Sequence, residues 1–192
     1  MTARRDPETR RRRIVTAAVS AIADVGVGNV THRRIAELAG VPLGSTTYYF
    51  PTLDDLVAAA LREAIEYARA DLEAWADELL SSADLVESFV DLTVRHLGDR
   101  EQLLLEYELY LAAARSPQLR PLAQLWIDGL RGICARFAGK DRGFALAALI
   151  DGHLVQALVT EEPLDTAALR AGVERLVDRQ EGLSPRTAGG SI

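Results

Sequence analysis

Apolar residues recur at helical spacing along almost the whole chain, and the first such stretch predicts a helix that begins near residue 7. Asp6 is suited to cap its N-terminus and Pro7 to occupy its first position, while Gly26 and Gly28 end it. One side of this predicted helix is apolar and consists of Ile14, Ala17, Ala18, Ala21 and Ile22.

Two short helices are predicted next. Thr31 can cap the first of them, and Gly40 ends it. Pro42 begins the second, which runs over residues 43–49 and stops before Pro51, because proline disfavours helical geometry in the residue that precedes it. Two short helices separated by a glycine turn are typical of a helix-turn-helix unit.

The remaining helices are longer. Thr52 and Asp55 have the spacing of a capping box at the start of the first of them. Their predicted ranges are 54–80, 84–98, 100–115, 118–138, 142–160 and 166–180. Because no alternating run predicts a strand, the fold class is all-α, with about nine helices. We expect a helix-turn-helix domain over 1–51, a second helical domain over 52–182, and a flexible tail over 183–192.

Charge is distributed unevenly along the chain. The net charge is −6, yet the first fifty residues contain eight arginines and only four acidic residues. An acidic protein with a basic N-terminal segment repels polyanions except at that segment. This distribution favours a nucleic-acid reader joined to an acidic body, and a solvated basic tail without a partner is the alternative.

Other compositional features exclude several classes of site. Cys134 is the only cysteine, and the histidines are His32, His96 and His153, so we expect no disulfide, metal site, catalytic residue or cofactor. No apolar run approaches the ~20 residues of a membrane span. The basic start leads into no signal-type apolar segment, and we therefore expect a cytoplasmic protein without a membrane partner.

The helix-turn-helix segment has a physical rationale. Ala36 allows the two short helices to approach closely, and Gly40 tolerates the left-handed backbone that their turn requires. The second short helix is then free to present its outer side to a DNA groove. Its small hydroxyls and aromatic rings suit base edges, thymine methyl groups and phosphates. The residues concerned are Leu43, Gly44, Ser45, Thr47, Tyr48 and Tyr49.

Residues 8–60 resemble the tetracycline-repressor (TetR) family of bacterial regulators. The resemblance rests on the basic first helix, Thr31, Ile35-Ala36, Ala39-Gly40-Val41, Gly44, Tyr48-Tyr49-Phe50 and the Thr52…Leu56 opening of the next helix. It implies that the first three helices bind DNA, that the fourth transmits a signal, and that the others form a ligand cavity and a dimer. It also implies that Thr31 touches a phosphate and that Tyr49 reaches the DNA backbone. Arg33 and Arg34 are further candidates for phosphate contacts.

Three positions depart from the family pattern. Pro42 replaces a capping serine, and Thr46 stands where a leucine usually fills the core. Leu53 replaces a frequent lysine that grips phosphate, which is expected to remove one phosphate contact and to reduce the salt dependence by about one unit of slope.

Candidate effector contacts lie in the C-terminal body. Rings with a polar tip combine apolar bulk with a hydrogen-bonding group, as in small-molecule cavities, although core packing explains them equally well. The candidate set is Phe89, His96, Leu103, Tyr107, Tyr110, Trp126, Leu130 and Phe137. For Glu106 we favour a surface ion pair over an inward-facing specificity group, and for His153 a buried or interface position.

The last two predicted helices have the composition of a subunit interface. Small residues permit close approach, and leftover apolar surface favours a four-helix contact between two copies of the chain. The candidate interface residues are Ala148, Gly152, Leu158, Leu169, Val173 and Leu176. A monomer that buries these helices internally is the alternative.

The leading hypothesis is a repressor that binds a palindromic DNA operator as a homodimer and is released by a small apolar or amphipathic organic effector. A DNA-binding regulator without small-molecule control is one alternative. A small helical enzyme is another, but Cys134 lies in an apolar stripe that should raise its pKa rather than activate it.

Overall fold

The computed structural model describes residues 6–160 and 162–177. Within these ranges the chain forms nine α-helices, two short 3-10 turns and no strand, which confirms the predicted all-α class. The helices fall into two compact units. One unit comprises Met1–Trp75 with His96–Gly129, and the other comprises Ala76–Arg95 with Leu130–Ile192. The predicted tail over 183–192 lies outside the described residues.

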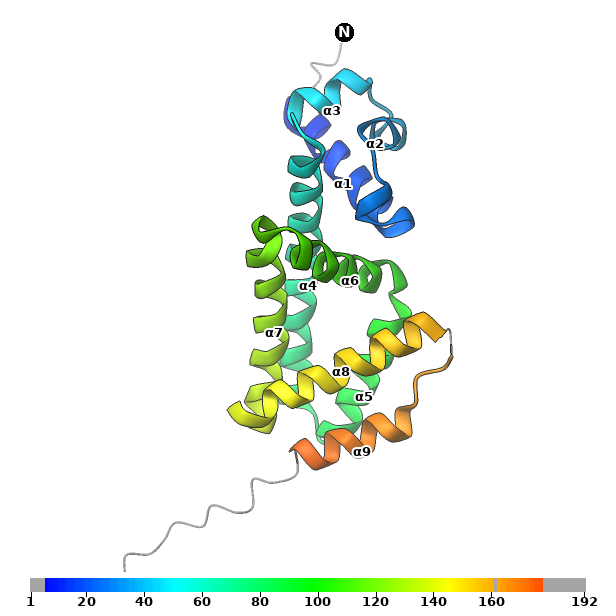
Figure 1. The fold of residues 1–192 in the computed structure, drawn as a ribbon. Coiled ribbons are helices and arrows are strands. Elements are labelled where there is room, and N and C mark those ends of the chain that lie inside the picture. The colour runs from blue at the N-terminus through cyan, green and yellow to red at the C-terminus, as the bar shows by residue number, and fades with distance from the viewer. Residues whose placement is uncertain (1–5, 161, 178–192) are drawn as a thin grey trace, which may run out of the picture. The chain divides into compact units, whose positions relative to one another are not determined.

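The N-terminal head consists of α1 (Pro7–Val25), α2 (His32–Ala39) and α3 (Leu43–Tyr49), shown in blue and cyan in Figure 1. Both predicted caps are confirmed. The Asp6 carboxylate accepts a hydrogen bond from the backbone N–H of Glu8 at 3.1 Å, and the Thr31 hydroxyl accepts one from that of Arg34 at 3.2 Å. Each cap satisfies a donor that the first helical turn leaves unpaired.

The turn between α2 and α3 is fixed from two directions. Gly40 has φ +60°, a left-handed conformation that favours glycine. Beside it, the Arg13 guanidinium donates to the carbonyl of Ala39 at 2.6 Å, which satisfies the C-terminus of α2. The core beneath is aliphatic, and its buried members are Ile14, Ala18, Ile22, Ile35, Ala36 and Ala39.

α4 (Leu53–Ser81) begins with the predicted capping box. The Thr52 hydroxyl accepts from the N–H of Asp55 at 3.1 Å, and the Asp55 carboxylate accepts from the N–H of Thr52 at 3.3 Å. The same unit contains α6 (Arg100–Arg115), which packs on α1. The head and α6 therefore belong to one compact unit, and the domain boundary predicted at residue 51 stays a prediction.

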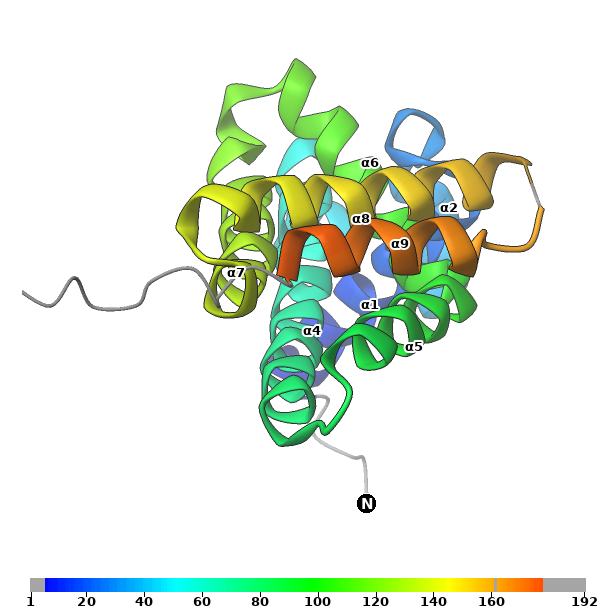
Figure 2. The same cartoon turned by 90° about the horizontal axis from the view of Figure 1, so that it is seen from below.

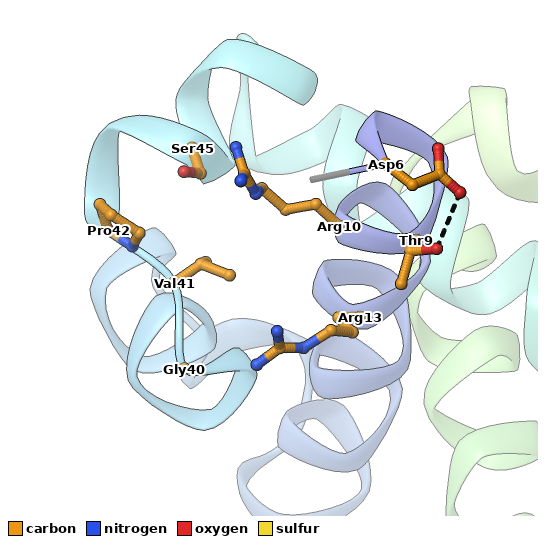
Figure 3. Close-up of a pocket in the computed structure, with 8 residues that line it drawn as sticks. All are labelled: Asp6, Thr9, Arg10, Arg13, Gly40, Val41, Pro42 and Ser45. Atoms are coloured by element: carbon orange, nitrogen blue, oxygen red, sulfur yellow. Dashed lines mark hydrogen bonds between the residues drawn. The ribbon is translucent and has the colours of Figure 1, made fainter. Parts of the chain in front are cut away.

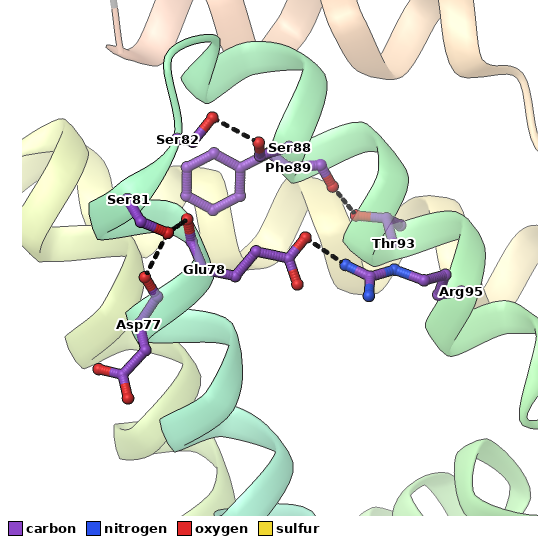
Figure 4. Close-up of polar contacts among 8 residues, drawn as sticks. All are labelled: Asp77, Glu78, Ser81, Ser82, Ser88, Phe89, Thr93 and Arg95. Carbon is purple, nitrogen blue, oxygen red and sulfur yellow. Dashed lines mark hydrogen bonds and ion pairs between the residues drawn. The ribbon is translucent and has the colours of Figure 1, made fainter.

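In the second unit, α8 (Lys140–Thr160) and α9 (Thr166–Val177) lie side by side, as Figure 2 shows. The end of α4 and α5 (Leu85–Gly98) are joined by polar contacts. Figure 4 shows the Arg95 guanidinium donating to the Glu78 carboxylate at 2.5 Å, and the hydroxyls of Ser82 and Ser88 hydrogen-bonded at 2.6 Å. α7 (Arg120–Ala138) has its second half in this unit.

α8 is long and apolar enough to cross a membrane, and it is the one helix of the described chain with such a length and composition. Packing accounts for one side of this helix, where Leu146, Ile150 and Leu154 are buried in the core. Helices in the cores of globular proteins have the same composition, so α8 alone is weak evidence for a membrane span.

Candidate nucleic-acid interface

α3 presents an exposed edge of small, hydroxyl and aromatic residues. The Tyr48 side chain is 80% exposed, and Leu43, Gly44 and Thr47 are also exposed. Ser45 is half-buried, as is Tyr49, whose ring meets that of Tyr48 edge-to-face at 5.2 Å between centroids. Solvent-exposed aromatic rings beside hydroxyls offer hydrogen bonds and apolar contacts to a duplex. We call these six residues the recognition edge.

Thr46 faces the opposite way. It is fully buried, and its hydroxyl donates to the carbonyl of Leu43 at 2.8 Å, so a polar group in the core is satisfied within its own helix. Thr46 therefore occupies the core position at which the family pattern has leucine. α3 keeps its inward anchor, and the recognition edge stays free of core packing.

The α2 candidates differ in availability. Thr31 and Arg33 are exposed, but Arg34 is half-buried and forms an ion pair with Asp24 at the end of α1. A phosphate contact by Arg34 would compete with this pair, whereas Thr31 and Arg33 are open to a DNA backbone.

A groove of about 440 Å³ lies between the start of α1 and the α2–α3 turn. Figure 3 shows Arg10 reaching across it toward Ser45 of the recognition edge, while Arg13 turns to the α2 terminus. A cation beside the groove-facing helix suits a DNA phosphate. The sequence indicated a basic first helix but could not separate these two roles.

The candidate effector residues are divided between the two compact units. His96, Leu103, Tyr107, Tyr110 and Trp126 belong to the first unit. Phe89, Leu130 and Phe137 belong to the second, where the two phenyl rings meet edge-to-face at 5.8 Å between centroids. Leu103, Leu130 and Phe89 are buried within the fold, as a core role requires.

Glu106 is not on the surface, and the preference for a surface ion pair is wrong. Its side chain is buried, and its Oε2 lies 2.9 Å from Nε2 of His96. The side-chain amide of Gln102 donates to its other carboxylate oxygen at 3.1 Å. A buried carboxylate needs such partners, and the decisive one comes from a different helix.

The candidate interface residues also divide by burial. Ala148 is exposed, and Gly152 and Leu176 are half-buried. Leu169 and Val173 are fully buried and Leu158 nearly so, because these positions face the core; their side chains are not open to a partner. Sequence reasoning missed three exposed apolar residues of α8, which are Phe144, Val155 and Val159.

Together with Ala148 and Gly152, these three residues form a stripe that we call the α8 stripe. Consecutive members are three or four residues apart, which places them on one side of the helix. His153 on the same helix is half-buried rather than fully buried, and the interface position stays a prediction.

Cys134 has the environment of a core residue. Burial, with a smaller contribution from the charge of Asp151, raises the pKa of its thiol to about 12. At neutral pH the side chain is therefore the unreactive thiol. In the part of the chain that is described, no cluster of three or more His, Cys, Asp or Glu side chains could hold a metal ion.

A hydrogen bond adds to the packing of α6 on the head. The backbone N–H of Val27, in the turn between α1 and α2, donates to the Glu108 carboxylate at 2.9 Å. Nothing in the local sequence around Glu108 indicates this role, because its partner lies 81 residues away.

Comparison with known proteins agrees with this architecture. The family model described as "Bacterial regulatory proteins, tetR family" matches residues 14–60, and that described as "Tetracyclin repressor-like, C-terminal domain" matches residues 80–179. The HTH-type transcriptional regulator BetI of Cronobacter sakazakii is 25% identical over 185 residues, which is 89% of this chain and 90% of BetI.

Solved structures are similar over most of the chain. A crystal structure of the multidrug binding protein EbrR complexed with proflavin has 41% sequence identity and a TM-score of 0.74, and covers 88% of this chain and 99% of EbrR. Others show EbrR with ethidium and with malachite green. A TetR-family member of Streptomyces coelicolor A3, SCO1917, has 42% identity and a TM-score of 0.76, over 88% of this chain and 98% of its own.

Proposed function

Because this chain belongs to the TetR family of bacterial regulators, we propose that it is a repressor that binds a palindromic operator as a homodimer and leaves it when a planar aromatic cation binds. Like its relatives, it is a ligand-responsive DNA-binding regulator and not an enzyme. The protein would bind its operator in the cytoplasm.

The observation that carries the proposal is the recognition edge. Tyr48 and Thr47 are exposed and Ser45 is within reach of solvent, while Thr46 alone anchors α3 in the core. A helix held by one side and open on the other is the arrangement that enters a major groove. Arg10 and Arg33 would add phosphate contacts, which position the helix without reading sequence.

The α8 stripe supports the homodimer. Exposure of apolar side chains to water costs free energy, and pairing with the same stripe of a second copy would bury them. Leu176 of α9 is half-buried and could extend such an interface. A two-fold dimer would place two α3 helices roughly 34–36 Å apart, the distance of one DNA turn.

Replacing Val155 by aspartate is expected to give a monomer. Two like charges would face each other across a two-fold interface, and operator affinity would fall by about a hundredfold or more because one head cannot grip both half-sites. Sedimentation equilibrium and gel shifts measure the two effects. Exposed Leu80 lies on α4, so Leu80→Asp is the control. A Val155→Asp protein that stays dimeric would contradict the assignment of the stripe.

The effector class is inferred from relatives and from this chain together. Proflavin, ethidium and malachite green, three of the ligands named for EbrR, are all aromatic cations. In this chain, aromatic rings of the first unit lie near a buried carboxylate, Glu106. Carboxylates and indole faces both attract cations, so the same ligand class fits.

Glu108 is the contact through which a bound effector would act on the head. It shares α6 with Glu106, two residues away, and holds the N–H of Val27. A shift of α6 would therefore change how the turn before α2 is held. The effector releases DNA only if it prefers the shifted state, whatever its affinity.

Selection of bound fragments from random DNA, with and without ethidium, tests the whole proposal. We expect enrichment of a palindrome and its loss when ethidium is present. Because ethidium also intercalates in DNA, release must be repeated with a helix-turn-helix protein that lacks an aromatic site. A palindrome that no cation releases would favour a regulator without small-molecule control, and no enrichment at all would overturn the proposal.

A further inference from the structure

Within the first unit, residues from four helices bring two indole rings, an imidazole and a carboxylate together. Trp75 comes from α4, His96 from α5, Glu106 from α6 and Trp126 from α7. His96, Glu106 and Trp126 are buried, and Trp75 is half-buried, so Trp75 is the member of the cluster that is partly exposed to solvent. We call these four residues the imidazole cluster.

The imidazole ring of His96 contacts both indoles. Its centroid lies 5.0 Å from that of Trp75, with the rings nearly perpendicular at 83°, and 6.1 Å from that of Trp126, with the rings inclined by 31°. On its polar side Nε2 lies 2.9 Å from the Glu106 carboxylate. When protonated, His96 is itself a flat aromatic cation, held by two indole rings and an anion.

Charged neighbours favour the protonated form of this ring. Burial alone lowers the pKa of His96, but the hydrogen bond and charge of Glu106 more than offset that effect, so the pKa is raised above the ordinary histidine value. The charges of Asp99 at the start of α6 and Asp71 on α4 act in the same direction. When His96 is protonated, the carboxylate of Glu106 therefore has a cationic partner from within the chain.

We propose that His96 is a built-in occupant of the effector site, and that an aromatic cation binds by taking its place between Trp75, Trp126 and Glu106. This inference rests on the proposed function, because it assumes the cationic effector class. Ligand and proton then compete: the entering cation replaces the imidazolium as the partner of Glu106. The displaced ring moves into water, where it loses its proton above the ordinary histidine pKa of about 6.5.

The competition fixes the sign of the pH dependence. Below about pH 6.5 the displaced imidazole keeps its proton, so cation affinity is low and does not change with pH. Between that pH and the raised pKa of His96 in the free protein, each bound cation releases up to one proton, and the affinity rises by up to tenfold per pH unit. Above the raised pKa, His96 is neutral and the affinity reaches a plateau.

Ethidium is a suitable probe because its charge is permanent between pH 5.5 and 9.5. We expect its dissociation constant, measured by fluorescence with the full-length protein at fixed ionic strength, to fall as pH rises through this window. In His96→Gln the constant should be independent of pH and as low as the wild-type plateau. In Glu106→Gln it should be at least tenfold higher than that plateau. His153→Gln, at a half-buried histidine of the second unit, is the matched control and should keep the wild-type profile.

Each outcome decides between the two ideas. A flat wild-type profile, or a His96→Gln protein that keeps the pH dependence, overturns the role of His96 while the cationic effector class stands. Absence of ethidium binding at every pH, with operator binding intact, overturns both. If His96→Gln fails to fold, calorimetry of the wild-type protein decides, at several pH values from 6.5 to 9.5 and in buffers of different ionisation enthalpy. Release of no proton on ethidium binding at any of these pH values contradicts the proposal.

Discussion

Replacing Tyr48 and Ser45 together by alanine is expected to abolish the operator shift of the full-length protein. Base and phosphate contacts are typically worth about 1–3 kcal/mol each, and a dimer would lose two in each half-site. At about 1.4 kcal/mol per tenfold change, the affinity should fall by more than about a hundredfold. Gel shifts at fixed salt measure this loss.

The fold should survive the double substitution. Tyr48 is highly exposed and Ser45 is half-buried, and substitutions at such positions change stability by only about 0.5 kcal/mol. Tyr67→Ala is the matched control, because Tyr67 is 65% exposed on α4 and lies outside the recognition edge. It should leave both stability and operator affinity unchanged. Normal operator binding by the Tyr48/Ser45 variant would mean that another surface reads the DNA.

The largest effect on stability is expected at Gly143, where α8 meets α7. A Cβ added there would lie 2.6 Å from the backbone Cα and N of Ala135, closer than carbon atoms pack, and a backbone cannot move aside as a flexible side-chain tip can. Gly139, with φ +78°, allows the sharp corner between the two helices that brings them so close. Gly143→Ala should cost about 3 kcal/mol.

For a chain of this size that loss corresponds to a fall in Tm of roughly 6–12 °C, measurable by circular dichroism. Gly132 on α7 provides the control, because a Cβ there would meet nothing within 4 Å. Gly132→Ala should stabilise the helix by about 0.5–1 kcal/mol. Similar melting temperatures for the two variants would show that α7 and α8 are not in close contact at Gly143.

Local features of the fold were predictable because their causes are local. Asp6, Thr31 and the Thr52–Asp55 pair act as caps through contacts within three residues, so sequence spacing alone identifies them. The predicted helix ranges differ from those observed by about two residues at most of the ends that the structure describes. The packing of a helix-turn-helix unit also indicated that α3 would have an outer side, and its burial pattern agrees.

Features that depend on distant parts of the chain were not predictable. Glu106 was expected at the surface because a carboxylate is normally solvated, and only the arrival of His96 from α5 makes its burial tolerable. Leu169 and Val173 are apolar at helical spacing, which fits a core and an interface equally well. The recognition edge could be predicted because its residues all lie on one short helix, and their exposure depends on how that helix packs in the helix-turn-helix unit.

Glu108 has a consequence for hybrid regulators. A chimera joined near residue 51 would combine the head of one protein with the α6 of another, and so would separate the N–H of Val27 from the carboxylate that receives it. Residue 26 must also be small in such a chimera, because a Cβ at Gly26 would lie 2.8 Å from the Glu108 carboxylate. Transplanted heads should therefore keep their DNA sequence preference but respond to the new effector only when residues 26, 27 and 108 are exchanged as a set.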